Sequence, residues 1–198
     1  GVLKGRYNAV SEIIDVESPK WDAARDMMEQ FRFGEDYYCA FYEISFNNVM
    51  YYRKSNIESI GAEDPRTLFE AGNWTWDTFL DISRTWQESG DNRWCLDGYN
   101  PENDLVISTG VPMVGNDGTK LINNLHDPAV ERAEELLTTL QQENLRYPRH
   151  ELNGWSVNPK AWANNQILFY ADGGTWVYES TLATFEQAFG WTEDDIQV

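Results

Sequence analysis

Apolar residues recur at helical spacing in two long segments of the chain. In residues 76–88 they fall on one face, and Thr75 before them and Gly90 after them are typical helix boundaries. Residues 128–144 show the same spacing after Asp127, with valine, alanine and leucine on the inner face and acidic residues outside. The pattern predicts an α-helix in each segment.

Three short runs are rich in apolar, β-branched and aromatic residues instead, at 46–52, 94–98 and 167–171. Such runs are typical of buried strands. Helical patterns separate them along the chain, and strands that alternate with helices indicate an α/β fold. We therefore predict a compact, helix-rich body in which these three runs pair in one small sheet.

The remaining elements are shorter. Ser18 and Pro19 predict the start of a helix that ends near Gly34, and residues 37–43 have strand composition. Residues 111–124 alternate apolar clusters with Gly and Asn, which predicts a β-hairpin with its turn at Asn116–Gly118. Further short helices are expected at residues 55–61, 65–71 and 101–109 and after Pro159.

One stretch, QILFYADGGTWVYES at residues 166–180, combines a buried strand with a tight turn. Gly173 and Gly174 allow the turn, Thr175 can cap a helix over residues 176–189, and Trp176 falls in its first turn beside unpaired backbone N–H groups. A flat aromatic ring beside free donors suits a sugar. The same tryptophan could equally fill the space between strand and helix, and this stretch alone leaves both interpretations open.

The composition is strongly acidic and aromatic. Lys and Arg total 15 against 33 Asp and Glu, which gives a net charge of −18 and disfavours nucleic acids and anionic membranes as partners. The chain nevertheless has 9 Trp, 10 Tyr and 9 Phe, more than a core of this size needs. Aromatic residues in excess indicate surfaces that stack on a ligand.

No motif in the sequence requires catalysis, a cofactor or a metal. His126 and His150 have no metal-ligand spacing, and the two cysteines, Cys39 and Cys95, form no zinc motif and are expected as separate thiols rather than a disulfide. Glu102 with Asp104, or Asp172, could serve as the acid and base of a glycosidase. In so acidic a chain, solvated surface carboxylates are the simpler interpretation.

Four segments in order carry a resemblance: FNNVMYYRKSNIESIGAEDP (46–65), GNWTWDTFLDIS (72–83), DPAVERAEELLTTL (127–140) and NNQILFYADGGTW (164–176). With them the chain resembles extracellular solute-binding proteins of carbohydrate ABC transporters, related to maltose-binding proteins. The resemblance implies a periplasmic-binding-protein-like (type II) lobe, helix-rich with a small mixed sheet. It also implies an internal fragment, in which residues 1–43 derive from the amino-terminal lobe and 44–198 form the carboxyl-terminal lobe with a hinge crossing.

The resemblance also implies a sugar site. Trp176, beside Gly174 and Thr175, matches the stacking tryptophan of the family. Asn100, Glu102 and Asn103 follow a short strand where the family places sugar contacts, although the aromatic residue often found there is absent. Further contacts are expected at the hinge crossing and on the rim of the cleft, from Glu43, Asn47 and Trp155.

The implied function is non-enzymatic: capture of a sugar or oligosaccharide between two lobes and delivery to a membrane permease. The parent protein would act outside the cytoplasmic membrane of a bacterium, lipid-anchored or free. One alternative is a glycoside-active enzyme, which would share the acidic, tryptophan-rich composition. The other is a carbohydrate-binding module, a class that is usually all-β and does not suit the predicted helices at 76–88 and 128–144.

Overall fold

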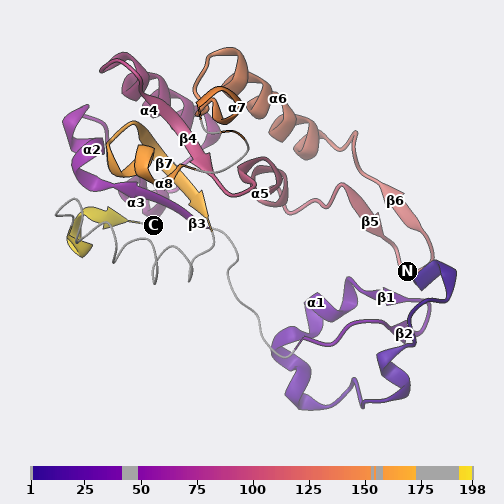
Figure 1. Ribbon diagram of the computed structural model, residues 1–198. Helices are drawn as coiled ribbons and strands as arrows, with labels where there is room; N and C mark the ends of the chain where they lie inside the picture. The colour runs from indigo at the N-terminus through magenta and orange to yellow at the C-terminus, as the bar shows by residue number, and fades with distance from the viewer. Residues whose placement is uncertain (1, 42–48, 153, 155–157, 173–191, 198) are drawn as a thin grey trace. The chain divides into compact units, whose positions relative to one another are not determined.

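The structure is a computed structural model that describes residues 2–41, 49–152, 154, 158–172 and 192–197 (Figure 1). The chain divides into two compact units. The first comprises residues 1–45 and 106–131, and the second comprises residues 46–105 and 132–198. Residues 106–131, expected in the same lobe as the segments on either side of them, are grouped here with the leading residues. The assignment of segments to lobes stays a prediction.

Short elements make up most of the described part of the first unit. Its helical segments are the 3-10 turns Val2–Lys4, Val10–Glu12 and Pro19–Ala24 and the helix α1 (Arg25–Glu29). Its strands are β1 (Arg32–Phe33), β2 (Asp36–Tyr37), β5 (Val114–Asn116) and β6 (Leu121–Asn123). β1 pairs antiparallel with β2, and β5 pairs antiparallel with β6. The Gly34 N–H donates to the Gly118 carbonyl at 2.5 Å and therefore ties the β5–β6 turn to the first hairpin.

Two expectations for this unit need revision. The helix expected from Ser18 to Gly34 begins as predicted at Pro19 but is a 3-10 turn followed by five α-helical residues, and it ends at Glu29. The strand expected at 37–43 is wrong over its described part, because β2 ends at Tyr37 and residues 38–41 have no regular structure. Strand propensity depends on the surroundings of a segment, so composition alone did not predict this outcome. The hairpin predicted at 111–124 is confirmed.

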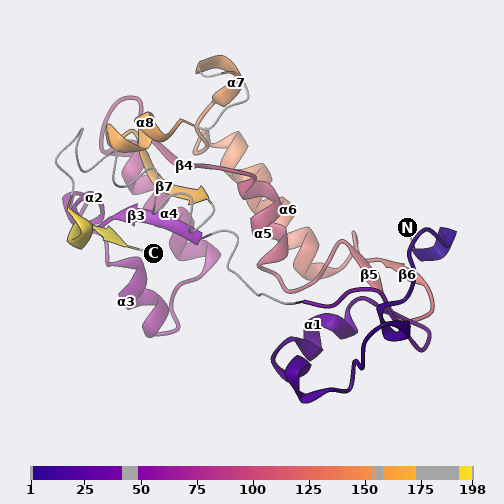
Figure 2. The same ribbon diagram turned by 60° about the horizontal axis from the view of Figure 1, so that its bottom comes forward.

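A four-stranded mixed sheet organises the second unit, in the order β4-β7-β3-β8 (Figures 1 and 2). Its strands are β3 (Val49–Arg53), β4 (Trp94–Gly98), β7 (Ile167–Asp172) and β8 (Ile196–Gln197). β4 and β7 are parallel, while β3 is antiparallel to both β7 and β8. The predicted sheet of three runs is therefore confirmed for the described residues, and residues 46–48 lie outside them.

Helices with clear sequence signals follow the prediction closely. They are α2 (Lys54–Ser59), α3 (Pro65–Glu70), α4 (Trp76–Glu88), α5 (Pro101–Ile107), α6 (Pro128–Gln142) and α8 (Pro159–Ala163). A further short helix, α7 (Arg149–Leu152), was not predicted from the sequence pattern. The Thr75 hydroxyl accepts from the Thr78 N–H at 3.2 Å at the start of α4. The Asp64 carboxylate accepts from the Arg66 N–H at 2.8 Å at the start of α3. Such caps satisfy donors that a helix leaves open, which explains why these starts were predictable.

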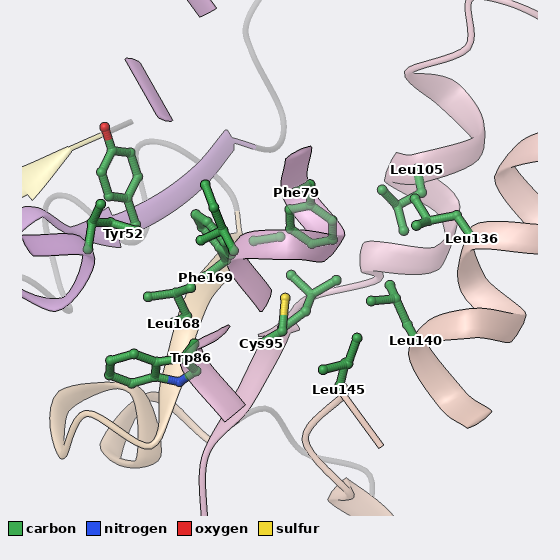
Figure 3. Packing of buried hydrophobic residues seen from close by; sticks show 14 of the residues in the cluster. Tyr52, Phe79, Trp86, Cys95, Leu105, Leu136, Leu140, Leu145, Leu168 and Phe169 are labelled. Carbon is green, nitrogen blue, oxygen red and sulfur yellow. The ribbon is translucent and has the colours of Figure 1, made fainter. Parts of the chain in front are cut away.

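The core of the second unit is an apolar cluster between the sheet, α4 and α6 (Figure 3). Trp86 on α4 and Phe169 on β7 are almost fully buried, and the Phe79 and Phe169 rings lie 5.3 Å apart. Cys95 lies inside this cluster, where its sulfur is 2.6 Å from the Ser83 hydroxyl oxygen. Burial raises the pKa of the Cys95 thiol to about 12, so it is protonated at neutral pH. Both Cys95 and Cys39 are free thiols.

The end of β4 approaches β7 so closely that only glycine fits there. Gly98 has a φ of +142°, and a Cβ built on it would lie 1.8 Å from the Ala171 carbonyl oxygen. The same carbonyl accepts the Tyr99 N–H at 2.7 Å. Glycine at position 98 is therefore a requirement of the sheet edge itself.

We predict that Gly98→Ala destabilises the protein by about 3–5 kcal/mol, because the added methyl group collides with backbone that cannot move independently. The matched control is Gly72→Ala, since Gly72 also has a positive φ, +73°, but no atom within 4 Å of the added Cβ. Gly72→Ala should lower the free energy of unfolding by about 1–2 kcal/mol, because alanine disfavours a positive φ but its methyl group meets no other atom. Urea denaturation measures both variants, and equal losses would contradict the close approach.

Candidate functional site

The carboxyl end of β4 carries the predicted site residues that the structure describes. The chain leaves β4 at Gly98, passes Tyr99 and Asn100, and enters α5 at Pro101 (Figure 1). Asn100 has a φ of +54°, a left-handed conformation that Asn adopts more readily than most residues. Its carbonyl accepts the Asn103 N–H at 3.0 Å and thereby begins the helix. A ligand group at this edge meets polar side chains on a short, defined turn.

Three predicted residues meet here. Asn100 and Asn103 are exposed, and Glu102 is half-buried in the first turn of α5. Tyr99 precedes them and is 60% exposed, so an aromatic ring does stand at this edge. Tyr99 was not predicted as a site residue. The available signal was an aromatic residue between Gly98 and Asn100, two residues that break a strand.

Glu102 contacts Arg146, which lies between α6 and α7. Burial raises the pKa of Glu102, but the hydrogen bond from its own backbone N–H and the charge of Arg146 outweigh that effect, so the pKa lies below its ordinary value. A general acid must keep its proton near neutral pH. Glu102 is therefore poorly suited to the acid role that the glycosidase alternative would give it.

A second arginine and a buried acid lie beside the same turn. The Asp97 side chain is only 1% exposed and accepts a hydrogen bond from Arg149 Nε. Arg149 also donates through Nη2 to the Gly98 carbonyl. Sequence reasoning missed Asp97, Arg146 and Arg149, because each interacts across more than forty residues and no local pattern marks them.

The other predicted site residues lie outside the described residues. They are Trp176, Gly174, Thr175, Glu43, Asn47 and Trp155. Val49 is the first described residue after Glu43 and Asn47, and Asp172 is the last described residue before Gly174, Thr175 and Trp176. Val49 and Asp172 are register partners in β3 and β7. Gly98 is the register partner of Ala171, so β4 ends at the same edge of the sheet.

An apolar pocket of about 260 Å³ also opens in the second unit. Met50 and Phe169 from the sheet, Phe69 on α3 and Trp74 contribute to its lining. Of the three predicted site residues that the structure describes, Asn100, Glu102 and Asn103, none lines it. The described residues give it a largely apolar wall, without the convergent polar groups that orient a sugar.

Searches of the described residues give two further results. They contain no group of three or more His, Cys, Asp or Glu side chains placed to hold a metal ion. In that same part of the chain, the helices are too short or too polar to cross a membrane.

Comparison with known proteins gives one family. The model of the family described as bacterial extracellular solute-binding protein matches residues 4–192. A search of curated proteins finds no match.

Solved structures with a similar fold come from several bacteria. The sugar-binding protein MalE from Xanthomonas citri has a TM-score of 0.63 and 14% identity, covering 96% of this chain and 47% of its own. The acarbose-binding GacH receptor of Streptomyces glaucescens has a TM-score of 0.59 and 14% identity, covering 99% and 47%. A sugar transporter protein from Arthrobacter chlorophenolicus with bound laminaribiose has a TM-score of 0.57 and 17% identity, covering 98% and 47%. The chain thus spans about half the length of these proteins and shares their periplasmic-binding-protein-like fold.

We predict that the Glu102–Arg146 pair stabilises the protein at neutral pH and ceases to do so in acid. A carboxylate whose pKa is lowered on folding contributes stability above its unfolded pKa, near 4.5, and that contribution disappears as the pH falls through the folded pKa. In a double-mutant cycle of Glu102→Gln and Arg146→Gln, the coupling is expected to be about 0.5–1 kcal/mol at pH 7, since the pair is partly exposed.

The same cycle at about pH 3 should give a coupling near zero. The matched control is the Arg66–Glu70 pair, whose side chains are both more than 60% exposed and whose atoms lie 3.4 Å apart. Its coupling should be smaller at pH 7, about 0.2–0.5 kcal/mol. A Glu102–Arg146 coupling that is the same at both pH values would contradict the lowered pKa.

Proposed function

The chain belongs to the bacterial extracellular solute-binding proteins, and we propose that the full-length protein is the sugar-binding component of a carbohydrate ABC importer. One observation of the structure supports this most directly. Tyr99, Asn100 and Asn103 present an exposed aromatic ring beside two exposed amides where β4 ends. Aromatic rings cover the apolar face of a sugar, while amides exchange hydrogen bonds with its hydroxyls.

The charges at this edge favour a neutral ligand. Arg146 pairs with Glu102, and Arg149 pairs with Asp97. These four side chains therefore cancel in charge. Oligosaccharides such as laminaribiose and acarbose, which similar proteins bind, are the class of ligand we propose.

The rest of the proposed site lies outside the described residues. Trp176 would stack on the sugar, with Gly174 and Thr175 beside it at a helix start. Glu43 and Asn47 would reach the ligand from the hinge crossing, and Trp155 would contact it from the rim. The proposal places the ligand between two lobes of the full-length protein, with residues 44–198 as most of the carboxyl-terminal one.

Delivery follows from closure. A ligand that binds the closed form better shifts the protein toward it, and the permease would recognise that form. We propose that the protein is not an enzyme. The lowered pKa of Glu102 supports this, because an ionised Glu102 could not act as the acid of a glycosidase. Outside the cytoplasmic membrane, either a lipid anchor or a soluble form would keep it near the permease.

Thermal unfolding of the full-length protein with laminaribiose, acarbose and chitin oligosaccharides tests the function. A bound sugar stabilises the folded state by about 2.7 kcal/mol at a hundred times its Kd, which raises the Tm by several degrees. The same samples are assayed for release of reducing ends. A stabilising sugar with no turnover supports a transport binder; steady release of reducing ends would establish the glycoside-active alternative.

We predict that Trp176→Ala leaves folding nearly intact and weakens sugar binding by about 1–3 kcal/mol, because a large aromatic surface no longer covers the sugar. The matched control is Trp86→Ala, since Trp86 is 1% exposed in the core. That variant should lose about 3–5 kcal/mol of stability. Calorimetric titration and denaturation separate the two effects, and a Trp176→Ala protein that loses stability but keeps its affinity would refute the stacking role.

A further inference from the structure

The Arg149 side chain joins two neighbouring groups at the end of β4. Its Nε donates to the Asp97 carboxylate and its Nη2 donates to the Gly98 carbonyl. Arg149 is only 17% exposed at its side chain, and that of Asp97 is 1% exposed. A planar guanidinium can hold two acceptors at a fixed angle, which a lysine ammonium does not do.

The Asp97 carboxylate is held from its other side as well. Its second oxygen accepts the Asn158 N–H at 3.0 Å. The Asn158 side chain in turn accepts the Ala161 N–H at 3.1 Å and donates to the Tyr147 hydroxyl at 2.7 Å. Asp97 is thus a fixed anchor, because a buried charge keeps its place only when it is paired on all sides.

This anchor fixes one peptide group. The carbonyl of the Gly98–Tyr99 peptide accepts from Arg149, and its N–H donates to the Ala171 carbonyl at 2.7 Å. Both ends of that peptide plane are therefore held. On either side of Tyr99, Gly98 and Asn100 have φ values of +142° and +54°. Backbone in such regions persists only where its surroundings determine it.

We propose that Arg149 is a positioning residue of the sugar-binding edge. It does not contact the sugar in this account; it sets the direction in which Tyr99 and Asn100 leave the sheet by fixing the peptide between Gly98 and Tyr99. The proposal rests on the proposed function, because a turn held in one orientation matters most when its side chains must meet a ligand together.

Arg149→Lys tests this most sharply. The lysine keeps the positive charge opposite Asp97 but cannot serve the Gly98 carbonyl in the same fork geometry. The matched control is Arg84→Lys, since Arg84 contacts both Glu143 carboxylate oxygens, at 2.7 and 2.8 Å, on the exposed side of α4. Both variants are made in the full-length protein.

Amide hydrogen exchange is the first measurement, and it needs no sugar. In Arg149→Lys the Tyr99 amide should exchange about tenfold faster, because its peptide has lost one of two restraints. The Cys95 amide, which donates to the Leu145 carbonyl at 2.6 Å, should keep its rate. In Arg84→Lys both rates should equal those of the wild type. An unchanged Tyr99 rate in Arg149→Lys overturns the proposal.

Affinity is the second measurement, with laminaribiose and acarbose as probes. Arg149→Lys should bind the sugar that stabilises the wild type about tenfold more weakly, the loss expected for one charge-assisted hydrogen bond. Arg84→Lys should bind it as the wild type does. Faster exchange with unchanged affinity overturns the proposal, since the ligand would then not depend on this turn.

The outcome is also defined if a variant does not fold or if the wild type binds no sugar. If Arg149→Lys fails to fold, the neutral double variant Asp97→Asn with Arg149→Gln replaces it under the same expectations, and failure of both assigns Arg149 to folding alone and overturns the proposal. A wild type that binds none of the sugars refutes the proposed function and this proposal with it. A wild type that binds, beside an Arg149→Lys protein that binds equally well, refutes this proposal alone.

Discussion

The buried carboxylate of Asp97 is the constraint on which the end of the sheet depends. A carboxylate that is only 1% exposed must be compensated, and Arg149 and the Asn158 N–H do so from two directions. The partners come from segments more than fifty residues away, so the carboxylate joins three parts of the second unit. Tyr99 and Asn100 leave β4 directly beyond this point, which links the packing of the unit to its candidate ligand surface.

The elements that could be predicted are those whose causes are local. α4 begins after the Thr75 cap, and its buried stripe is fixed by helical spacing alone. The continuous apolar run in the sequence predicts the strand Ile167–Asp172, and its first four residues are almost fully buried. In both cases the residues that determine the element lie close together in the sequence, so the local pattern is enough to predict it.

The elements that could not be predicted depend on distant partners. Residues 38–41 have strand composition but no regular structure, because composition alone does not determine whether a strand finds a partner. No local pattern marks Arg149 on the short helix α7, because its contacts are with Asp97 and Gly98, more than fifty residues away on β4. Tyr99 was overlooked for a similar reason, because its exposure follows from the close approach of Gly98 to Ala171. Six of the nine predicted site residues lie outside the described residues and stay predictions.

We propose that the carboxyl end of β4 faces the sugar. Backbone amide NMR of the full-length protein, recorded during titration with laminaribiose or acarbose, tests it most directly. We expect the amide signals of Tyr99, Asn100 and Asn103 to shift during the titration, while those of Phe69 and Trp74 at the apolar pocket stay in place. Shifts confined to the Phe69 and Trp74 region, with Tyr99, Asn100 and Asn103 unchanged, would contradict it.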